Sequence, residues 1–285
     1  MTDGFLPVDK PAGPTSHDVV AIARRAFRTR RVGHAGTLDP FATGLLLVLV
    51  GRATRLAPYL SGLPKAYTGR IRLGTRTDTD DRTGQVLSQQ TVGEGLSDAD
   101  ILAEMAALTG RYAQEPPQYS AKKVEGRRAY ALARRGQTVS LRPALVEVAR
   151  FTMTRRAGAD LEFLAEVSSG TYLRSLARDL GERLGCGGHL DALRRVSVGG
   201  YAIAEAESLE AVREGRAVLR PMLEAVRDMP RMDIDEAARA RVRHGQALSD
   251  ALAVEGPVAL VGAEGLVAVA EPQGGQLEPR VVLEG

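Results

Sequence analysis

A single carboxylate in a glycine-rich turn is the residue of this chain best placed to do chemistry. Asp39 lies in the segment GTLDP at positions 36–40, so Pro40 follows it directly. Taken alone, an Asp before a Pro is typical of a helix start, where Asp caps the first turn and Pro takes the first helical position. Two neighbouring features indicate a ligand site instead. Arginines crowd the segment before the turn, and Gly33 and Gly36 leave the backbone open to close approach.

The sequence lacks the familiar short motifs for nucleotide binding, for zinc proteases and for serine hydrolases. It contains no G-x-x-x-x-G-K-[ST], G-x-G-x-x-G, H-E-x-x-H or G-x-S-x-G. The acidic run at 78–81 fails the calcium-loop template, because Arg82 and Thr83 stand where a ligand and the invariant glycine belong, so we expect a solvated loop. Cys186 is the only cysteine, beside four histidines, which excludes a disulfide scaffold and argues against structural zinc. We therefore expect no cofactor and no metal.

Positive charge gathers at the N-terminal end of the chain. Residues 1–77 hold 12 basic and four acidic side chains, whereas residues 200–285 hold nine basic and 15 acidic ones. A basic N-terminal third favours a polyanionic partner, most simply a nucleic acid. The helix expected over 16–31 carries five arginines opposite its apolar stripe: Arg24, Arg25, Arg28, Arg30 and Arg31. Like charges without acids between them repel one another, so nearby phosphates would stabilise this face.

The hydrophobic pattern predicts helices and strands that intermix without the regularity of βαβ units. Helices are expected over 16–31, 97–108 and 171–184, and strands over 45–50, 67–73, 146–154 and 161–167. This order is typical of an α+β fold with a mixed, mainly antiparallel sheet flanked by helices and loops. Two strands within 257–270 and a third at 280–283 predict a small β-rich C-terminal domain. We place the two domains at 1–228 and 229–285.

The sequence indicates a cytoplasmic protein. Its longest apolar run, Leu45–Val50, is far shorter than the about 20 residues that span a bilayer. The N-terminus has no charged-then-apolar leader, so we expect neither secretion nor membrane contact.

Short motifs spread over roughly residues 4–210 occur in the order typical of one enzyme family. They are VDKPAG at 8–13, GHAGTLDP at 33–40 with ATG at 42–44, RTDTD at 76–80, YSA at 119–121, GTYLR at 170–174 and LRR at 193–195. In this set and order the chain resembles the bacterial tRNA pseudouridine-55 synthases, the TruB family. Its C-terminal module resembles a PUA domain, a small β-barrel-like RNA-binding appendage.

The resemblance implies that uridine-55 in the T-arm loop of tRNA is isomerised to pseudouridine without metal or nucleotide. The uridine would be flipped out of the folded loop, and its uracil detached from C1′ at N1, turned and rejoined through C5. Asp39 matches the family's catalytic aspartate, which acts in its ionised form as a nucleophile at C1′ or a base at C2′. Arg174 matches the cation that orients this carboxylate. Tyr67 matches a tyrosine that would stack on the base and assist proton removal at C5.

Four further positions match residues that the family uses to hold RNA or the site itself. Tyr172 and Leu193 would line an apolar pocket for the uracil and exclude water. His34 would read the T-loop near the flipped base, and Lys10 would support the scaffold or contact a phosphate. Several of the residues matched to the family also have an ordinary structural explanation. Tyr67 fits the edge of the core, Leu193 fits core packing, His34 fits a turn and Arg174 fits the surface.

Three other functions fit parts of the sequence. An RNA-binding or tRNA-folding module would use the same basic face but would not need Asp39 beside Arg174. A guide-RNA-dependent relative is disfavoured by the compact two-part layout and the absence of Lys-rich tails, and a small-molecule hydrolase leaves the arginines unexplained. We expect a stand-alone monomer whose partner is the T-arm stem-loop of tRNA, with no obligate protein partner. The acidic balance of residues 200–285 fits RNA binding by the C-terminal module poorly.

Overall fold

The apolar run expected at 45–50 forms a strand, β3 (Thr43–Val50), in which seven of eight residues are buried. The computed structural model describes residues 3–93, 95–119, 123–124, 127–128, 142–249 and 253–284. These residues divide into two units. Unit 1 comprises Met1–Pro40, Gly44–Gly62 and Gly199–Gly285, and unit 2 comprises Phe41–Thr43 and Leu63–Val198.

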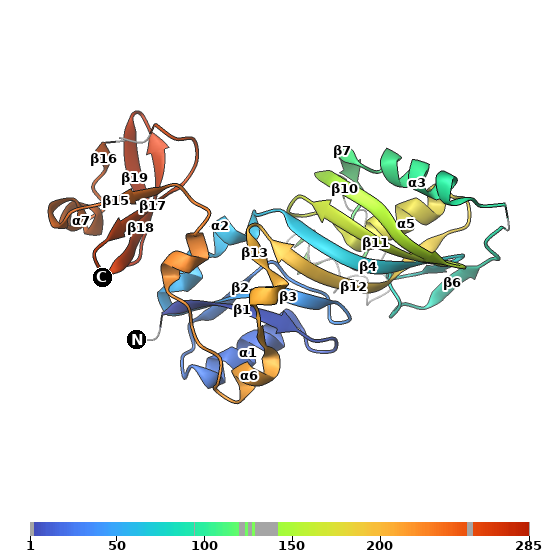
Figure 1. Cartoon of the computed structure of the whole chain (residues 1–285), viewed down its shortest axis with the longest axis horizontal. Helices are drawn as coiled ribbons and strands as arrows, with labels where there is room; N and C mark the ends of the chain where they lie inside the picture. The colour runs from blue at the N-terminus through green and yellow to red at the C-terminus, as the bar shows by residue number, and fades with distance from the viewer. Residues whose placement is uncertain are drawn as a thin grey trace. The chain divides into compact units, whose positions relative to one another are not determined.

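In unit 1, β3 pairs antiparallel with a strand along each of its edges. These are β1 (Gly4–Lys10) and β2 (Val32–Ala35), and β14 (Glu207–Ser208) adds to β1 in parallel. Two helices, α1 (Ser16–Ala26) and α6 (Leu209–Arg213), lie side by side against this sheet (Figure 1). Apolar side chains from the helices and the strands share one core. The sheet and its helix cover therefore form a firm base for the segment between β2 and β3.

Helix α1 begins where the sequence indicates but ends earlier than expected. Thr15 caps it, and Asp18 completes a capping box with the Thr15 backbone. The helix expected to reach residue 31 stops at Ala26, because Arg28 adopts a left-handed conformation with φ of 50°. The last arginines of the segment therefore lie on the turn to β2 rather than on the helix.

The C-terminal strands of unit 1 form a second sheet with its own apolar core. Its strand order is β15-β17-β18-β19-β16, and α7 packs against it. The elements are β15 (Arg231–Asp233), α7 (Glu236–Arg243), β16 (Leu248–Ser249), β17 (Val258–Gly262), β18 (Gly265–Gln273) and β19 (Gln276–Val282). The two strands expected within 257–270 are confirmed, and the third begins earlier than expected, at Gln276.

Five short elements complete unit 1, and the last of them lies in the chain between its two sheets. They are η1 (Gly51–Leu56), α2 (Ala57–Ser61), β13 (Tyr201–Ala202), η2 (Ile203–Glu205) and η3 (Met222–Val226). Arg52 of η1 joins the chain ends, since its Nε pairs with Asp3 at 2.7 Å and its Nη1 donates to the carbonyl of Leu283 at 2.6 Å.

Unit 2 is an antiparallel sheet with helices packed on it. Its strand order is β12 (Gly188–Val198), β4 (Lys65–Leu73), β11 (Asp160–Val167), β10 (Ala144–Ala157) and β7 (Gly110–Gln114). Helix α5 (Leu173–Arg183) packs on β12, and α3 (Asp98–Ala107) packs on β10 and touches α5. A hairpin of β5 (Thr75–Thr77) and β6 (Val86–Gln89) extends beyond the sheet (Figure 1). None of the described helices of the chain has the length and apolar content to cross a membrane.

The sequence between Lys122 and Arg135 is rich in basic residues, and most of it lies outside the described residues. Ser120 and Ala121 of the YSA motif are also outside them. Between 120 and 141 the structure describes the two-residue strands β8 (Lys123–Val124) and β9 (Arg127–Arg128), which pair with each other.

Helix α5 approaches β12 so closely that a glycine is required at the contact. The carbonyl of Gly181 accepts from the backbone N–H groups of Cys186 and Gly187, at 3.2 and 2.8 Å. A Cβ added to Gly181 would lie 2.3 Å from backbone atoms of Gly187 and Gly188. Backbone cannot yield as a flexible side chain does, so this contact fixes the distance between helix and sheet.

We expect Gly181→Ala to lower the free energy of unfolding by about 1–3 kcal/mol, the range typical of overpacked interiors. Urea unfolding followed by circular dichroism measures this loss. Gly93→Ala is the matched control, because a Cβ there would meet nothing within 4 Å. Equal unfolding midpoints for the two variants would contradict the close-contact argument.

Candidate active site

The turn that carries Asp39 leads into β3, and no helix begins there. The carbonyl of Pro40 accepts from the backbone N–H of Gly13 at 2.8 Å and from Nζ of Lys10 at 3.3 Å. A helix starting at Asp39 would use that carbonyl for its own first turn. The helix-start interpretation of Asp39-Pro40 is therefore wrong, and Asp39 lies half-buried in an irregular turn.

Ser16, in the first turn of α1, fixes the residue before Asp39. Its Oγ accepts from the backbone N–H of Leu38 at 2.9 Å and donates to the carbonyl of Leu38 at 3.2 Å. Ser16 is buried, so these bonds form away from water and hold the peptide firmly. The sequence offers no signal for this contact, because 22 residues separate the two partners.

Lys10 fixes the residue after Asp39. Its side chain has no exposed surface, and Nζ donates to the carbonyls of Pro11, Pro14 and Pro40 at 2.9, 2.8 and 3.3 Å. A buried ammonium group needs such acceptors to offset its lost hydration. Through these contacts Lys10 joins the chain at Pro11 and Pro14 to the turn of Asp39. His34, in β2 opposite Val48, is half-buried on the strand that leads into the same turn.

Tyr67 and Leu193 lie on one face of the sheet of unit 2. In the antiparallel pair of β4 and β12, Tyr67 is opposite Arg195 and Gly69 is opposite Leu193. Paired residues and residues two apart share a face, so Tyr67 and Leu193 are diagonal neighbours. Both are buried, with exposed fractions of 6% and 8%. The structure thus brings together two of the residues expected to surround a base.

Arg174, in the first turn of α5, is buried rather than on the surface. Its Nη1 donates to the carbonyl of Thr79 at 3.1 Å, and its Nη2 donates to the carbonyl of Tyr119 at 3.0 Å. A carboxylate oxygen of Asp81 lies 3.7 Å from Nη1. The guanidinium group therefore joins α5 to two other segments of unit 2.

The acidic run at 78–81 is not the solvated loop that the sequence predicts. Asp81 is 4% exposed, and its Oδ1 accepts from the hydroxyls of Thr79 and Thr83 at 2.8 and 2.6 Å. Asp80 pairs with Arg178 at 3.1 Å, one turn of α5 beyond Arg174. Two arginines that face inward from one helix require negative charge, and this loop supplies it.

Gln114, at the end of β7, was not among the predicted site residues, although it fixes the start of α5. Its Oε1 accepts from the backbone N–H of Tyr172 at 2.8 Å, and its Nε2 donates to the carbonyl of Tyr172 at 3.2 Å. Gln114 is 1% exposed. The following residue, Glu115, continues the contact, because its carbonyl accepts from the hydroxyl of Ser175 in α5 at 2.8 Å. Tyr172 and Arg174 are thereby held together in one helical turn.

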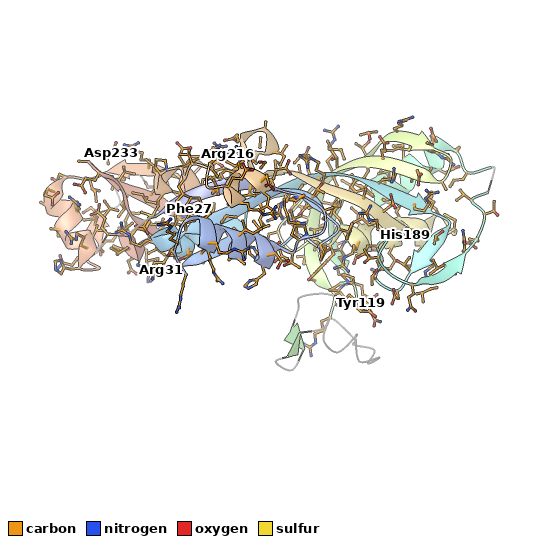
Figure 2. The ribbon with its side chains drawn as sticks, turned by 90° about the horizontal axis from the view of Figure 1, so that it is seen from below. Phe27, Arg31, Tyr119, His189, Arg216 and Asp233 are labelled. Atoms are coloured by element: carbon orange, nitrogen blue, oxygen red, sulfur yellow. The ribbon has the colours of Figure 1, made fainter. Side chains whose placement is uncertain are left out.

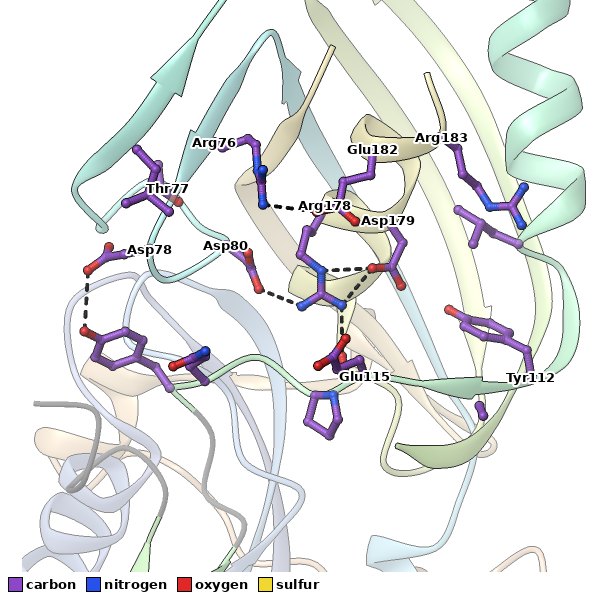
Figure 3. A pocket seen from close by; sticks show the side chains of 16 residues that line it. Arg76, Thr77, Asp78, Asp80, Tyr112, Glu115, Arg178, Asp179, Glu182 and Arg183 are labelled. Carbon is purple, nitrogen blue, oxygen red and sulfur yellow. Dashed lines mark hydrogen bonds and ion pairs between the residues drawn. The ribbon is translucent and has the colours of Figure 1, made fainter. Parts of the chain in front are cut away.

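A cavity of about 760 Å³ lies beside α5 in unit 2. Figure 3 shows Arg178 at its wall between Asp80 and Asp179, with Tyr112 at the border. Burial raises the pKa of Asp80 to about 6, although Arg178 opposes this shift. None of the predicted site residues lines this cavity. Among the described residues no group of three or more His, Cys, Asp or Glu could hold a metal ion.

Comparison with known proteins identifies relatives over the full length of the chain. A family model described as "TruB family pseudouridylate synthase (N terminal domain)" matches residues 24–173, and one described as "tRNA pseudouridylate synthase B C-terminal domain" matches residues 174–227. The chain is 48% identical to tRNA pseudouridine synthase B of Thermobifida fusca, with 100% of each chain covered. It is 45% identical to the protein of that name from Mycobacteroides abscessus, over 99% of this chain and 98% of the other.

Solved structures of related proteins share the fold. An H/ACA ribonucleoprotein bound to a substrate RNA that contains 2′-deoxyuridine matches with a TM-score of 0.76 and 25% identity, over 99% of this chain and 85% of that one. The archaeal box H/ACA Nop10–Cbf5 complex matches with a TM-score of 0.74 and 26% identity, over 99% of this chain and 86% of that one. The expected α+β fold, with a mainly antiparallel sheet and a β-rich C-terminal part, is confirmed.

The raised pKa of Asp80 predicts a pH dependence of stability. The folded carboxyl keeps its proton up to about pH 6, whereas in the unfolded chain it ionises near pH 4. The folded state binds more protons within this window, so stability falls as the pH rises through it. Asp80→Asn removes that loss. We expect the thermal midpoint of Asp80→Asn minus that of wild type to increase by about 2–4 °C between pH 4.5 and pH 7.

Differential scanning fluorimetry at several pH values provides the measurement. The control is Asp191→Asn, which removes a partly exposed partner of Arg70. If the thermal midpoints of wild type and Asp80→Asn change with pH in parallel, burial does not raise the pKa of the Asp80 carboxyl.

Proposed function

The chain belongs to the TruB family of pseudouridylate synthases, and from this we propose that it converts uridine-55 in the T-arm loop of tRNA to pseudouridine. As a member of that family it is an isomerase of uridine in tRNA. The reaction exchanges an N1–C1′ bond for a C5–C1′ bond within one nucleoside, so no atoms are gained and no co-substrate is consumed. The observation that carries the proposal is the turn of Asp39, whose backbone is fixed on both sides.

In the proposed reaction the uridine leaves the folded loop and Asp39 acts on its ribose, as a nucleophile at C1′ or as a base at C2′. A carboxylate on a rigid turn presents its oxygens in the same place at each encounter, which favours reaction. Arg174 supplies the positive charge that orients Asp39. Because Arg174 is already held by two carbonyls and Asp81, this charge needs little reorganisation during the reaction.

We propose that Tyr67, Tyr172 and Leu193 receive the extruded base. Burial of Tyr67 and Leu193 on one face of the sheet supports a water-poor surface for uracil. The Tyr67 hydroxyl assists removal of the C5 proton after the base has turned. His34 contacts the T-loop close to this base, and Lys10 maintains the turn through its three carbonyl contacts.

We also propose that the enzyme acts alone, as a cytoplasmic monomer on the T-arm stem-loop. Relatives named tRNA pseudouridine synthase B match at 43–48% identity, whereas the chains of H/ACA complexes match at 25–26%. That difference favours a stand-alone enzyme over a guide-RNA-dependent one. Residues 1–228 form its catalytic domain and residues 229–285 a PUA-like module, a division that the separate core of the C-terminal sheet supports.

We expect Asp39→Asn to abolish turnover while tRNA binding persists, because the amide keeps the shape of the turn and the basic surface. The assay is tritium release from C5 of uridine in an unmodified tRNA transcript with EDTA present, and carbodiimide-primer extension maps the modified position. Asp233→Asn, at an exposed site, is the control. Residual turnover of a tenth or more in Asp39→Asn would rule out its catalytic role, and release at another position would rule out uridine-55.

Tyr67→Phe keeps the aromatic ring and removes the hydroxyl. We expect tRNA affinity to stay within twofold of wild type and kcat to fall by about 100-fold, the scale of a lost proton-transfer group. Single-turnover kinetics separate the two effects, with Tyr59→Phe in α2 as the control. If kcat is unchanged, Tyr67 contributes stacking alone.

A further inference from the structure

Four exposed arginines lie at the end of α1 and on the turn that follows it. We call this cluster the arginine turn, and it consists of Arg25, Arg28, Arg30 and Arg31. Among the described residues, none of these four guanidinium groups pairs with a carboxylate. Figure 2 shows Arg31 extending away from the ribbon. The cluster is thus a local excess of positive charge without an internal counter-charge.

Many arginines elsewhere on the described surface form ion pairs with a carboxylate. Arg111 pairs with Glu147 at 2.8 Å, and Arg183 pairs with Glu104 at 2.9 Å. The chain has 38 basic and 35 acidic residues, so composition does not force a cluster without acids. Arg24 is excluded from the arginine turn, because its Nη2 donates to the carbonyl of Val32 at 3.4 Å within the fold.

Arg28 occupies a backbone position that glycine would fill with less strain. The N–H of Thr29 donates to the carbonyl of Arg24 at 3.1 Å and the N–H of Arg28 to that of Arg25 at 3.3 Å, which is the bonding pattern of a Schellman motif. In this motif the left-handed residue is usually glycine, and Arg28 has φ of 50°. The chain therefore keeps a charged side chain where the backbone alone favours none.

We infer that the arginine turn binds the phosphate backbone of the tRNA arm that carries the target uridine, an inference that rests on the proposed function. Guanidinium groups donate to phosphate oxygens in pairs and keep their charge at all physiological pH values. Arg31 lies eight residues before Asp39, and eight extended residues span at most about 28 Å. Phosphates bound here consequently belong to nucleotides near the reacting base.

A helix C-terminus also favours cations, and this explanation makes a different prediction. It accounts for Arg25 in the last turn of α1, but Arg30 and Arg31 lie beyond the helix. If the arginines only stabilised the helix, replacing them would change thermal stability and leave RNA affinity unaltered.

The test compares two variants in which the same number of charges is removed. The first changes Arg25, Arg28, Arg30 and Arg31 to Gln. The control changes four arginines that have acidic partners to Gln: Arg150, Arg155, Arg213 and Arg216. Fluorescence anisotropy gives the Kd for an unmodified tRNA transcript between 50 and 300 mM KCl. The logarithm of the association constant decreases linearly with the logarithm of the salt concentration, and we expect this decrease to become shallower by about 3 units of slope in the first variant. We also expect its affinity to be about tenfold lower near 0.15 M KCl. The control should change little in either quantity.

Arg28→Gly separates phosphate binding from fold stability. We expect this variant to melt at or above the wild-type temperature, because glycine relaxes the left-handed residue, and to lose about one unit of salt slope. Equal loss of affinity in the arginine-turn and control variants, or a lower melting temperature with unchanged affinity, would overturn the inference. Tritium release by wild type is measured on the same tRNA. Its absence would refute the proposed function, while the salt slopes would still decide whether the arginine turn binds phosphates.

Discussion

A guanidinium group removed from water must find its counter-charge and its acceptors inside the protein. Arg174 finds them in Asp81 and in the carbonyls of Thr79 and Tyr119, which belong to two segments far away in the sequence. Loss of the acidic loop would leave the buried charge without its carboxylate, and loss of the chain at Tyr119 would leave a buried N–H donor without this acceptor; both are destabilising. The acidic loop, the chain after β7 and the first turn of α5 are therefore stable in this arrangement only together.

Helix α5 is in turn held at both ends. At its start, Gln114 bonds to both backbone groups of Tyr172, and near its end Gly181 lies against the backbone of Gly187 and Gly188. A side chain in the first turn thus has little freedom to shift along or away from the sheet. The turn of Asp39 follows the same principle with different groups, because bonds to its two neighbouring residues fix it from either side.

Local pattern predicts the longer helices and several strands but not β1 or β12, and the roles of the site residues come from family resemblance alone. The apolar run of β3, the alternation of β4 and the stripe of α5 all have the periods that their structures require. The errors arose where distant partners decide the outcome. Asp39-Pro40 has the composition of a helix start, but Gly13 and Lys10 occupy the carbonyl that a helix would use. The acidic loop has the composition of a solvated turn, but arginines almost 100 residues later draw it inward.

Unit 1 is built from both ends of the chain, with nearly all of unit 2 lying between them in sequence. The core of its first sheet includes Leu209 and Val212, which are synthesised more than 150 residues after β3. At ordinary rates of translation that interval lasts about 8–30 s. During this time β1, β2 and β3 leave apolar surface uncovered, and exposed apolar surface makes an incomplete chain prone to aggregation. Asp39 is thus synthesised well before Leu209 and Val212 complete the core beneath its turn.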